Sequence, residues 1–226
     1  MVSNLPFMTS NTRLQELIQA VEKADSSDAL LEAVEALADA RLEEASPTLI
    51  AVLSYNNPGA AVAAVEGLVQ LGEVAVLPLL NLMDDYNYGG RAWAIRALAG
   101  IADPRALETL LKAAAEDFAM SVRRAAARGL GNLQWSKMPP SEVSAAQKRV
   151  FATLQLTSKD PEWVVRYATA VALQGLGKSV AVNQPDLVGE IKTQLEQMLE
   201  TDADLAVRTR VQLAMMQLQE LTVVAN

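Results

Sequence analysis

Cysteine and histidine are both absent from the 226 residues of the chain. Without cysteine the chain forms no disulfide and has no thiolate nucleophile, and without either residue it lacks the usual ligands of zinc. Histidine is also the usual general base near neutral pH. These absences exclude thiol and imidazole catalysis by the chain itself, and we expect no metal site.

Basic residues are in the minority, with 19 lysines and arginines against 27 acids and a net charge of -8. This charge opposes a strong attraction to polyphosphates, so we expect no nucleic-acid partner. The phosphate-binding pattern GxxxxGK[ST] and the dinucleotide pattern GxGxxG are missing too. The sequence therefore gives no support for nucleotide chemistry.

Long apolar runs are missing as well, and none approaches the roughly 20 residues that span a bilayer. The first residues, "MVSNLPFMTSNTR", lack the basic start and apolar stretch of a secretory signal. We therefore expect no membrane insertion and a cytoplasmic location. The apolar share of 51% still suffices for a sizeable core.

Alanine and leucine dominate, and apolar residues recur three and four positions apart, as in "LLEAVEALADA". This spacing predicts an all-α fold, since no stretch shows sustained period-two alternation. Proline follows a capping residue at four places, which predicts four helix starts. These pairs are Ser46-Pro47, Asn57-Pro58, Asp103-Pro104 and Asp160-Pro161.

An internal repeat is clearest in segments such as "GRAWAIRALAGIA", "SVRRAAARGLGNL" and "WVVRYATAVALQGLG". The equivalent positions are Ala61, Arg91, Arg123, Arg166 and Arg208, spaced 30, 32, 43 and 42 residues apart. Such spacing is typical of stacked helical hairpins, an α-α superhelix or solenoid. We expect a disordered N-terminus (1–11) and one solenoid domain (12–226), with an irregular first hairpin (12–45) and insertions at 134–148 and 177–186.

An acid stands six residues before the arginine in four of the repeats. The pairs are Asp85 and Arg91, Asp117 and Arg123, Asp160 and Arg166, and Asp202 and Arg208. A catalytic acid is needed once, whereas a recurring pair suits a ladder of charge-assisted bonds between successive hairpins. We interpret the eight residues as structural, and expect each acid to partner the arginine that follows it.

Aromatic residues are scarce, ten in all, yet three fall within eight positions in "DDYNYGGRAWAIRALAGIADPRAL". Tyr86, Tyr88, Trp93 and Arg96 are left over once the ladder is subtracted. Rings beside an arginine suit a flat, conjugated, anionic ligand. The alternative is that Trp93 fills space between hairpins and the tyrosines cap a turn; Trp135 and Trp163 are also expected to pack between hairpins.

The turn Asp, the Val-Arg pair and the alanine-rich stretch ending in Leu-Gly resemble HEAT repeats over residues 46–221. Within them, "DDYNYGGRAWAIRALAGIADPRALETLL" resembles the E/F-type phycobilin lyases of cyanobacteria, and in particular the shorter F-type partner. The resemblance implies a heterodimer with an E-type alpha subunit. It also implies that phycocyanobilin is a substrate, with no permanently bound cofactor, and is joined through a thioether to a cysteine of the phycocyanin alpha subunit.

Some F-type relatives isomerise the bilin and carry a motif with histidine and cysteine, so the absence of both implies attachment without isomerisation. For the bilin pocket we predict Tyr86, Tyr88, Trp93 and Arg96, with Asp84 as the candidate catalytic acid. The competing hypothesis is a HEAT-repeat scaffold that binds phycobiliproteins or other proteins without chemistry, because fold alone does not settle function.

Overall fold

The computed structural model of the chain describes residues 10–83 and 88–224. Within these ranges every regular element is a helix, which confirms the all-α prediction. No helix in the described part of the chain is both long and apolar enough to cross a bilayer. Residues 1–9 of the predicted disordered N-terminus lie outside the described residues.

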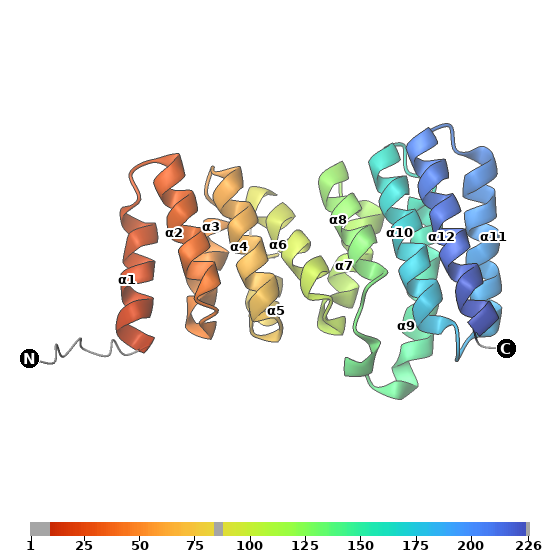
Figure 1. The fold of residues 1–226 in the computed structure, drawn as a ribbon, viewed down its shortest axis with the longest axis horizontal. Helices are drawn as coiled ribbons and strands as arrows, with labels where there is room; N and C mark the ends of the chain where they lie inside the picture. The colour runs from red at the N-terminus through yellow and green to blue at the C-terminus, as the bar shows by residue number, and fades with distance from the viewer. Residues whose placement is uncertain (1–9, 84–87, 225–226) are drawn as a thin grey trace, which may run out of the picture. The chain divides into compact units, whose positions relative to one another are not determined.

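The fold divides into two compact units, residues 1–97 and 98–226. The single domain predicted over 12–226 stays a prediction, and each unit is described by itself. The first unit contains α1 (Ser10–Lys23), α2 (Ser27–Asp39), the 3-10 helix η1 (Glu43–Ala45), α3 (Ser46–Val52), α4 (Pro58–Leu71), α5 (Glu73–Leu82) and most of α6 (Tyr88–Ile101). In this unit α2 packs on α4, while α1 packs on α2 and α3 on α4 (Figure 1).

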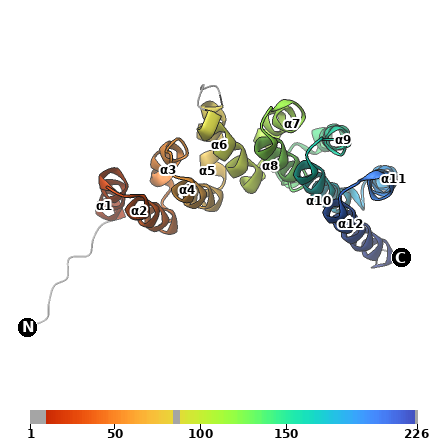
Figure 2. The same ribbon diagram turned by 90° about the horizontal axis from the view of Figure 1, so that it is seen from above.

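The second unit contains three helical hairpins, each made of a first and a second helix. Its elements are the end of α6, η2 (Pro104–Ala106), α7 (Leu107–Glu116), α8 (Met120–Leu130), η3 (Trp135–Lys137), α9 (Pro140–Thr157), α10 (Trp163–Val180), α11 (Pro185–Thr201) and α12 (Leu205–Val224). The first helices α7, α9 and α11 form one layer, and the second helices α8, α10 and α12 form the other (Figure 2). We call the latter the second-helix layer.

Three of the four proline pairs lie at helix starts, as predicted. Ser46 opens α3, Asn57 caps α4 by accepting from the Ala60 amide at 3.0 Å, and Asp103 caps η2. At the fourth pair, helix α10 begins only at Trp163. The delay arises because the Asp160 carboxylate accepts from the Glu162 amide at 2.9 Å, which holds a turn before the helix.

The predicted insertions lengthen helices and links. Residues 134–148 contain η3 and the start of the 18-residue helix α9, and residues 177–186 contain the last turn of α10 and its link to α11.

Small residues let the second helices approach closely. A Cβ on Gly131 would lie 2.3 Å from the Ala172 Cα, so α8 and α10 meet there backbone to backbone. The same principle holds in the first unit, where a Cβ on Gly67 of α4 would lie 2.7 Å from the Ala38 Cβ. Leucine side chains fill the interior between the helices, because protein cores pack as densely as organic crystals. Leu130, Leu154, Leu173 and Leu176 are fully buried.

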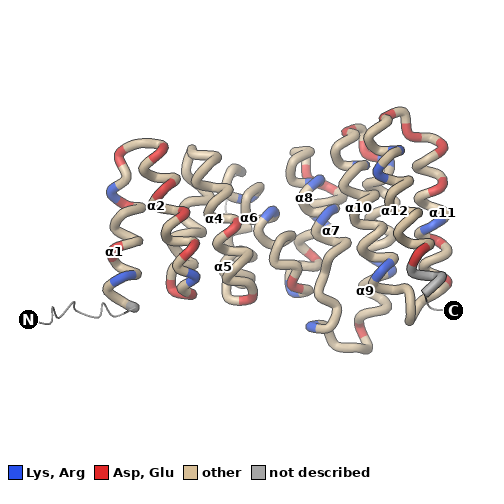
Figure 3. The backbone as a smooth tube through the Cα atoms, in the orientation of Figure 1, with Lys and Arg blue, Asp and Glu red and all other residues tan. Residues whose placement is uncertain are grey.

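The charge ladder exists, and it connects successive hairpins. Arg123 donates from Nε and Nη2 to the two carboxylate oxygens of Asp160 at 2.7 and 3.0 Å. Arg166 binds Asp202 in the same way, at 2.6 and 2.9 Å. Figure 3 shows basic and acidic positions side by side at the ends of these helices.

For Arg123 and Arg166 the predicted carboxylate partner was wrong. For both, the carboxylate comes from the next hairpin along the chain, while the acid six residues earlier offers its backbone carbonyl, as Asp117 does to Arg123 and Asp160 to Arg166, each at 2.9 Å. Arg208 likewise donates to the carbonyl of Asp202, at 2.7 Å. The arginine spans the turn of its own hairpin and still reaches the neighbouring turn, because its five donors point several ways. Asp85, the acid of the first predicted pair, lies outside the described residues.

Burial and ion pairing act in opposite directions on the ladder acids. Burial alone would raise the pKa of Asp160, but the bonds from Arg123 and the Glu162 amide more than offset it, and the pKa is lowered. The pKa of Asp202 is lowered chiefly by its bond to Arg166. Both acids are therefore held as carboxylates, and the arginine pKa values are raised in return.

Candidate functional site

Two of the predicted ligand-binding residues form a pair on α6. The Arg96 guanidinium carbon lies 5.4 Å from the centre of the Trp93 ring, because residues three apart share one side of a helix. This distance suits a cation-π contact, which orients the guanidinium. Arg96 is exposed and Trp93 is half-buried. The pair thus offers an aromatic ring and an available positive charge side by side.

The other predicted site residues receive no test from the structure. Asp84 and Tyr86 lie outside the described residues, and only the backbone of Tyr88, at the start of α6, is described. A pocket lined by all four predicted binding residues therefore stays a prediction. Because Trp93 is only partly buried, part of its ring is accessible to a ligand. Packing of Trp93 between hairpins stays the alternative.

Trp163 differs from the sequence expectation. It was expected to pack between hairpins, yet it is 45% exposed at the start of α10, and Tyr167 one turn later is 38% exposed. Residues four apart on a helix share a side, so the two rings lie on the same face of α10. Trp135 in η3 is half-buried.

A polar network links α10 to α12 on the second-helix layer. Arg210, only 9% exposed, donates from Nη2 to the Gln174 side-chain oxygen, and Gln174 in turn donates to Gln217. Lys178 donates to the same Gln217 oxygen at 3.3 Å. Burial lowers the pKa of Arg210 below its ordinary value, against an opposing effect of Tyr167. Within the described residues no carboxylate pairs with this arginine, and its Nη1 is buried without a hydrogen-bond partner.

Sequence reasoning missed Arg210, although the repeat contains a signal for it. Two residues after the equivalent positions of the second helices stand Ala63, Trp93, Ala125, Ala168 and Arg210. Three are alanines that allow close helix packing. A large side chain replaces alanine at Trp93 and at Arg210, so the repeat position itself marks both residues as exceptions.

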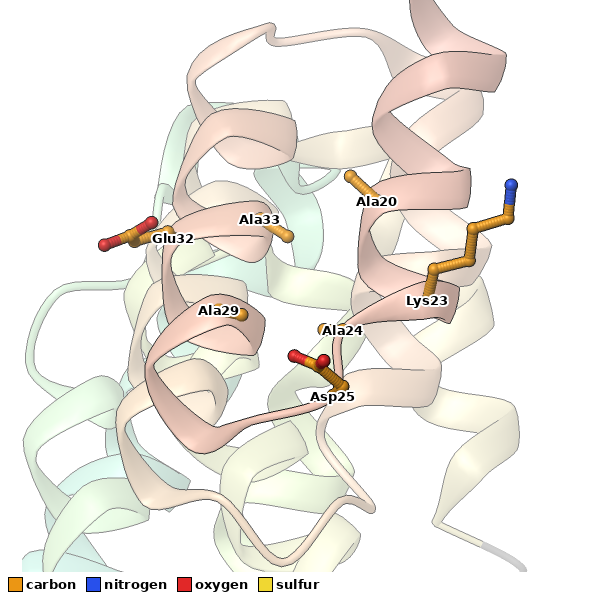
Figure 4. A pocket seen from close by; sticks show the side chains of 7 residues that line it. All are labelled: Ala20, Lys23, Ala24, Asp25, Ala29, Glu32 and Ala33. Carbon is orange, nitrogen blue, oxygen red and sulfur yellow. The ribbon is translucent and has the colours of Figure 1, made fainter.

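A shallow hollow of about 470 Å³ lies between α1 and α2 (Figure 4). Its lining residues are Ala20, Lys23, Ala24, Asp25, Ala29, Glu32 and Ala33. Alanines line its inner wall, whereas the Lys23 and Glu32 side chains point away from it. It contains no residue of the predicted bilin site and no aromatic ring, so it does not suit a flat conjugated ligand.

Comparison with known proteins agrees with the geometry. The model of HEAT repeats matches residues 76–174. A computationally designed armadillo repeat protein shares the fold at a TM-score of 0.56, 19% identity and 92% coverage of both chains. A chain from the complex of CpcE and CpcF of phycocyanin lyase from Nostoc sp. is 58% identical, with a TM-score of 0.69 over 76% of this chain and 98% of that one.

Two sequence relatives have names that correspond to this complex. The chain is 56% identical to phycocyanobilin lyase subunit beta of Pseudanabaena tenuis, over 92% of this chain and 74% of that protein. It is 53% identical to the phycocyanin alpha phycocyanobilin lyase CpcF of Synechocystis sp., over 81% of this chain and 86% of the relative. With its HEAT repeats and with this identity over most of its length, the chain belongs to the family of phycocyanobilin lyase beta subunits.

Proposed function

We propose that the chain is the beta subunit of a heterodimeric lyase that attaches phycocyanobilin to a cysteine of the phycocyanin alpha subunit. The observation that carries the proposal is the 58% identity to a chain of the CpcE and CpcF complex, over nearly all of that chain. The alpha partner is an E-type subunit, and phycocyanobilin is a substrate rather than a resident cofactor. A cytoplasmic location stays a prediction.

Thioether formation does not need a nucleophile from this chain. The thiol of the acceptor adds across a carbon-carbon double bond at one end of the bilin, so that sulfur joins one carbon and the thiol proton ends on the other. The sulfur belongs to the acceptor, which agrees with a chain that contains no cysteine. The lyase must hold the bilin in one orientation and exclude competing additions.

The pair on α6 supports this role. The Trp93 ring suits stacking on a pyrrole, and the exposed Arg96 guanidinium suits a propionate, with which arginine forms two parallel bonds. Asp84, two residues before Tyr86 in the chain, is proposed to orient or protonate the pyrrole system. Because the chain contains neither the histidine nor the cysteine of the motif in isomerising F-type relatives, we propose attachment without isomerisation.

Reconstitution tests the proposal directly. The chain is mixed with the E-type alpha subunit, phycocyanobilin and apo-phycocyanin alpha, and the acceptor is then denatured. We expect covalent pigment on the acceptor, with the absorption of an unisomerised bilin adduct. An acceptor with its cysteine replaced by alanine is the control and should stay colourless.

A colourless wild-type acceptor beside a stable three-protein complex would favour the non-catalytic scaffold instead. An adduct with the spectrum of an isomerised bilin would refute only the proposal on isomerisation.

A further inference from the structure

We propose that the second-helix layer of the second unit holds a carboxylate-binding site centred on Arg210, and that a propionate of the bilin occupies it. This inference rests on the proposed function. All residues of this site belong to the second unit, and none of them is Trp93 or Arg96.

Arg210 differs from the half-buried ladder arginines Arg123 and Arg166 in what it binds. The guanidiniums of Arg123 and Arg166 each form two bonds to a carboxylate of the next hairpin. Among the described residues, Arg210, which is 9% exposed, donates only to the side-chain oxygen of Gln174, and its Nη1 has no hydrogen-bond partner. A buried charge is costly when it is not paired, and a carboxylate ligand would supply the missing partner.

Lys178 adds a second positive charge to the hydrogen-bond network that contains Arg210. Lys178 reaches the same network through Gln217, whose side-chain oxygen accepts from both Lys178 and Gln174. The network thus joins two cations through two neutral amides, in a chain whose net charge is -8. An anion is the ligand that this arrangement favours.

The aromatic rings of Trp163 and Tyr167 on α10 indicate which class of anion the site would bind. Trp163, Tyr167, Gln174 and Lys178 are 4, 7 and 4 residues apart along α10, which places them on one face of the helix. Both rings on this face are exposed, at 45% and 38%. Inorganic phosphate would pair with the cations but make no use of the aromatic rings. A flat conjugated molecule with carboxylates would pair with the cations and stack on the rings.

The test compares bilin binding by the complex of the chain with its alpha partner. Titration by absorbance gives the Kd of phycocyanobilin and of its dimethyl ester, for the wild type and for Arg210→Met. We expect Arg210→Met to raise the Kd of the free acid about tenfold or more, which is the usual effect of losing a hydrogen bond to a charged group. The dimethyl ester should bind both proteins alike.

Matched variants separate charge from packing. Lys178→Met should weaken free-acid binding, whereas Lys148→Met, which removes an exposed lysine of α9 in the other layer, should not. Arg210→Lys should bind better than Arg210→Met, because lysine keeps the charge but loses the planar fork. The melting temperature of Arg210→Met should stay equal or rise, since methionine fills the space without a buried unpaired charge.

Each other outcome has a defined meaning. A wild-type complex that binds no bilin refutes the proposed function, and this inference with it. Wild-type binding that Arg210→Met leaves unchanged per folded molecule refutes the inference alone. An equal loss with the dimethyl ester would also overturn it, because the carboxylate would then not be the group recognised.

Discussion

Replacing Arg123 by alanine is the sharpest test of the ladder. The change removes two bonds to the Asp160 carboxylate, at 2.7 and 3.0 Å, and two to the carbonyls of Asp117 and Phe118, at 2.9 and 3.0 Å. It leaves the Asp160 side chain, only 7% exposed, with the Glu162 amide as a remaining donor. A nearly buried carboxylate then loses its counter-charge.

The expected cost follows from this burial. Removing one partner of a buried ion pair costs about 3 to 5 kcal/mol, because the remaining charge is left uncompensated. The Arg123 side chain is itself 13% exposed, so we expect the lower end, about 3 kcal/mol. For a protein of this size that corresponds to a melting temperature lower by roughly 6 to 12 °C.

A double-mutant cycle identifies the partner. Free energies of unfolding from urea titration are measured for Arg123→Ala, Asp160→Ala and the double variant. The double variant should lose much less than the sum, because no lone carboxylate remains. The parallel cycle with Asp117→Ala should show little coupling, since Arg123 binds the carbonyl of Asp117 and alanine retains that group.

Two results would refute this reasoning. One is a melting temperature for Arg123→Ala within about 2 °C of the wild type, far below the shift expected for a buried pair. The other is stronger coupling to Asp117 than to Asp160, which would restore the pairing inferred from sequence.

Three further predictions follow from the packing, the ladder and the α6 pair. Gly131→Ala should destabilise by about 3 kcal/mol in urea titration, because its Cβ would lie 2.3 Å from the Ala172 Cα; Gly189→Ala, where a Cβ meets nothing within 4 Å, is the control and should be neutral or stabilising. The folded-state pKa of Asp202 is lowered, so its stabilisation is complete above the ordinary value of 3.8 and is lost as pH falls from there toward the lower folded value. Relative to wild type, Asp202→Asn should therefore lose less stability over that acid range, and parallel acid-unfolding curves would contradict the linkage. Trp93→Ala should reduce pigment transfer per folded molecule, because stacking contributes about 0.5 to 1.5 kcal/mol beyond area burial. Arg96→Ala should reduce transfer more than Arg96→Lys, because lysine keeps the charge. Normal transfer by folded Trp93→Ala and Arg96→Ala would assign the pair to packing.

The candidate site was predictable in part, and the reason differs from residue to residue. Trp93 and Arg96 stand three apart in one helix, so their contact depends only on local geometry that the sequence specifies. The exposure of Trp163 was not predictable, because the sequence around a tryptophan at a helix start does not show whether a neighbouring hairpin covers its ring. The repeat marks Arg210 as an exception, but its burial was not predictable, since that depends on the approach of α10.

The sequence by itself determined the helices, the repeat and the presence of a ladder. The helices depend on apolar spacing and on capping residues such as Asn57, which act within a few residues of the chain. The repeat and the ladder depend on an acid and an arginine that recur along the sequence and can be read from it directly. Tertiary structure alone decided that Arg123 binds Asp160 rather than the side chain of Asp117. That choice depends on how closely α8 and α10 stack through Gly131, a distance between hairpins that no spacing along the chain encodes.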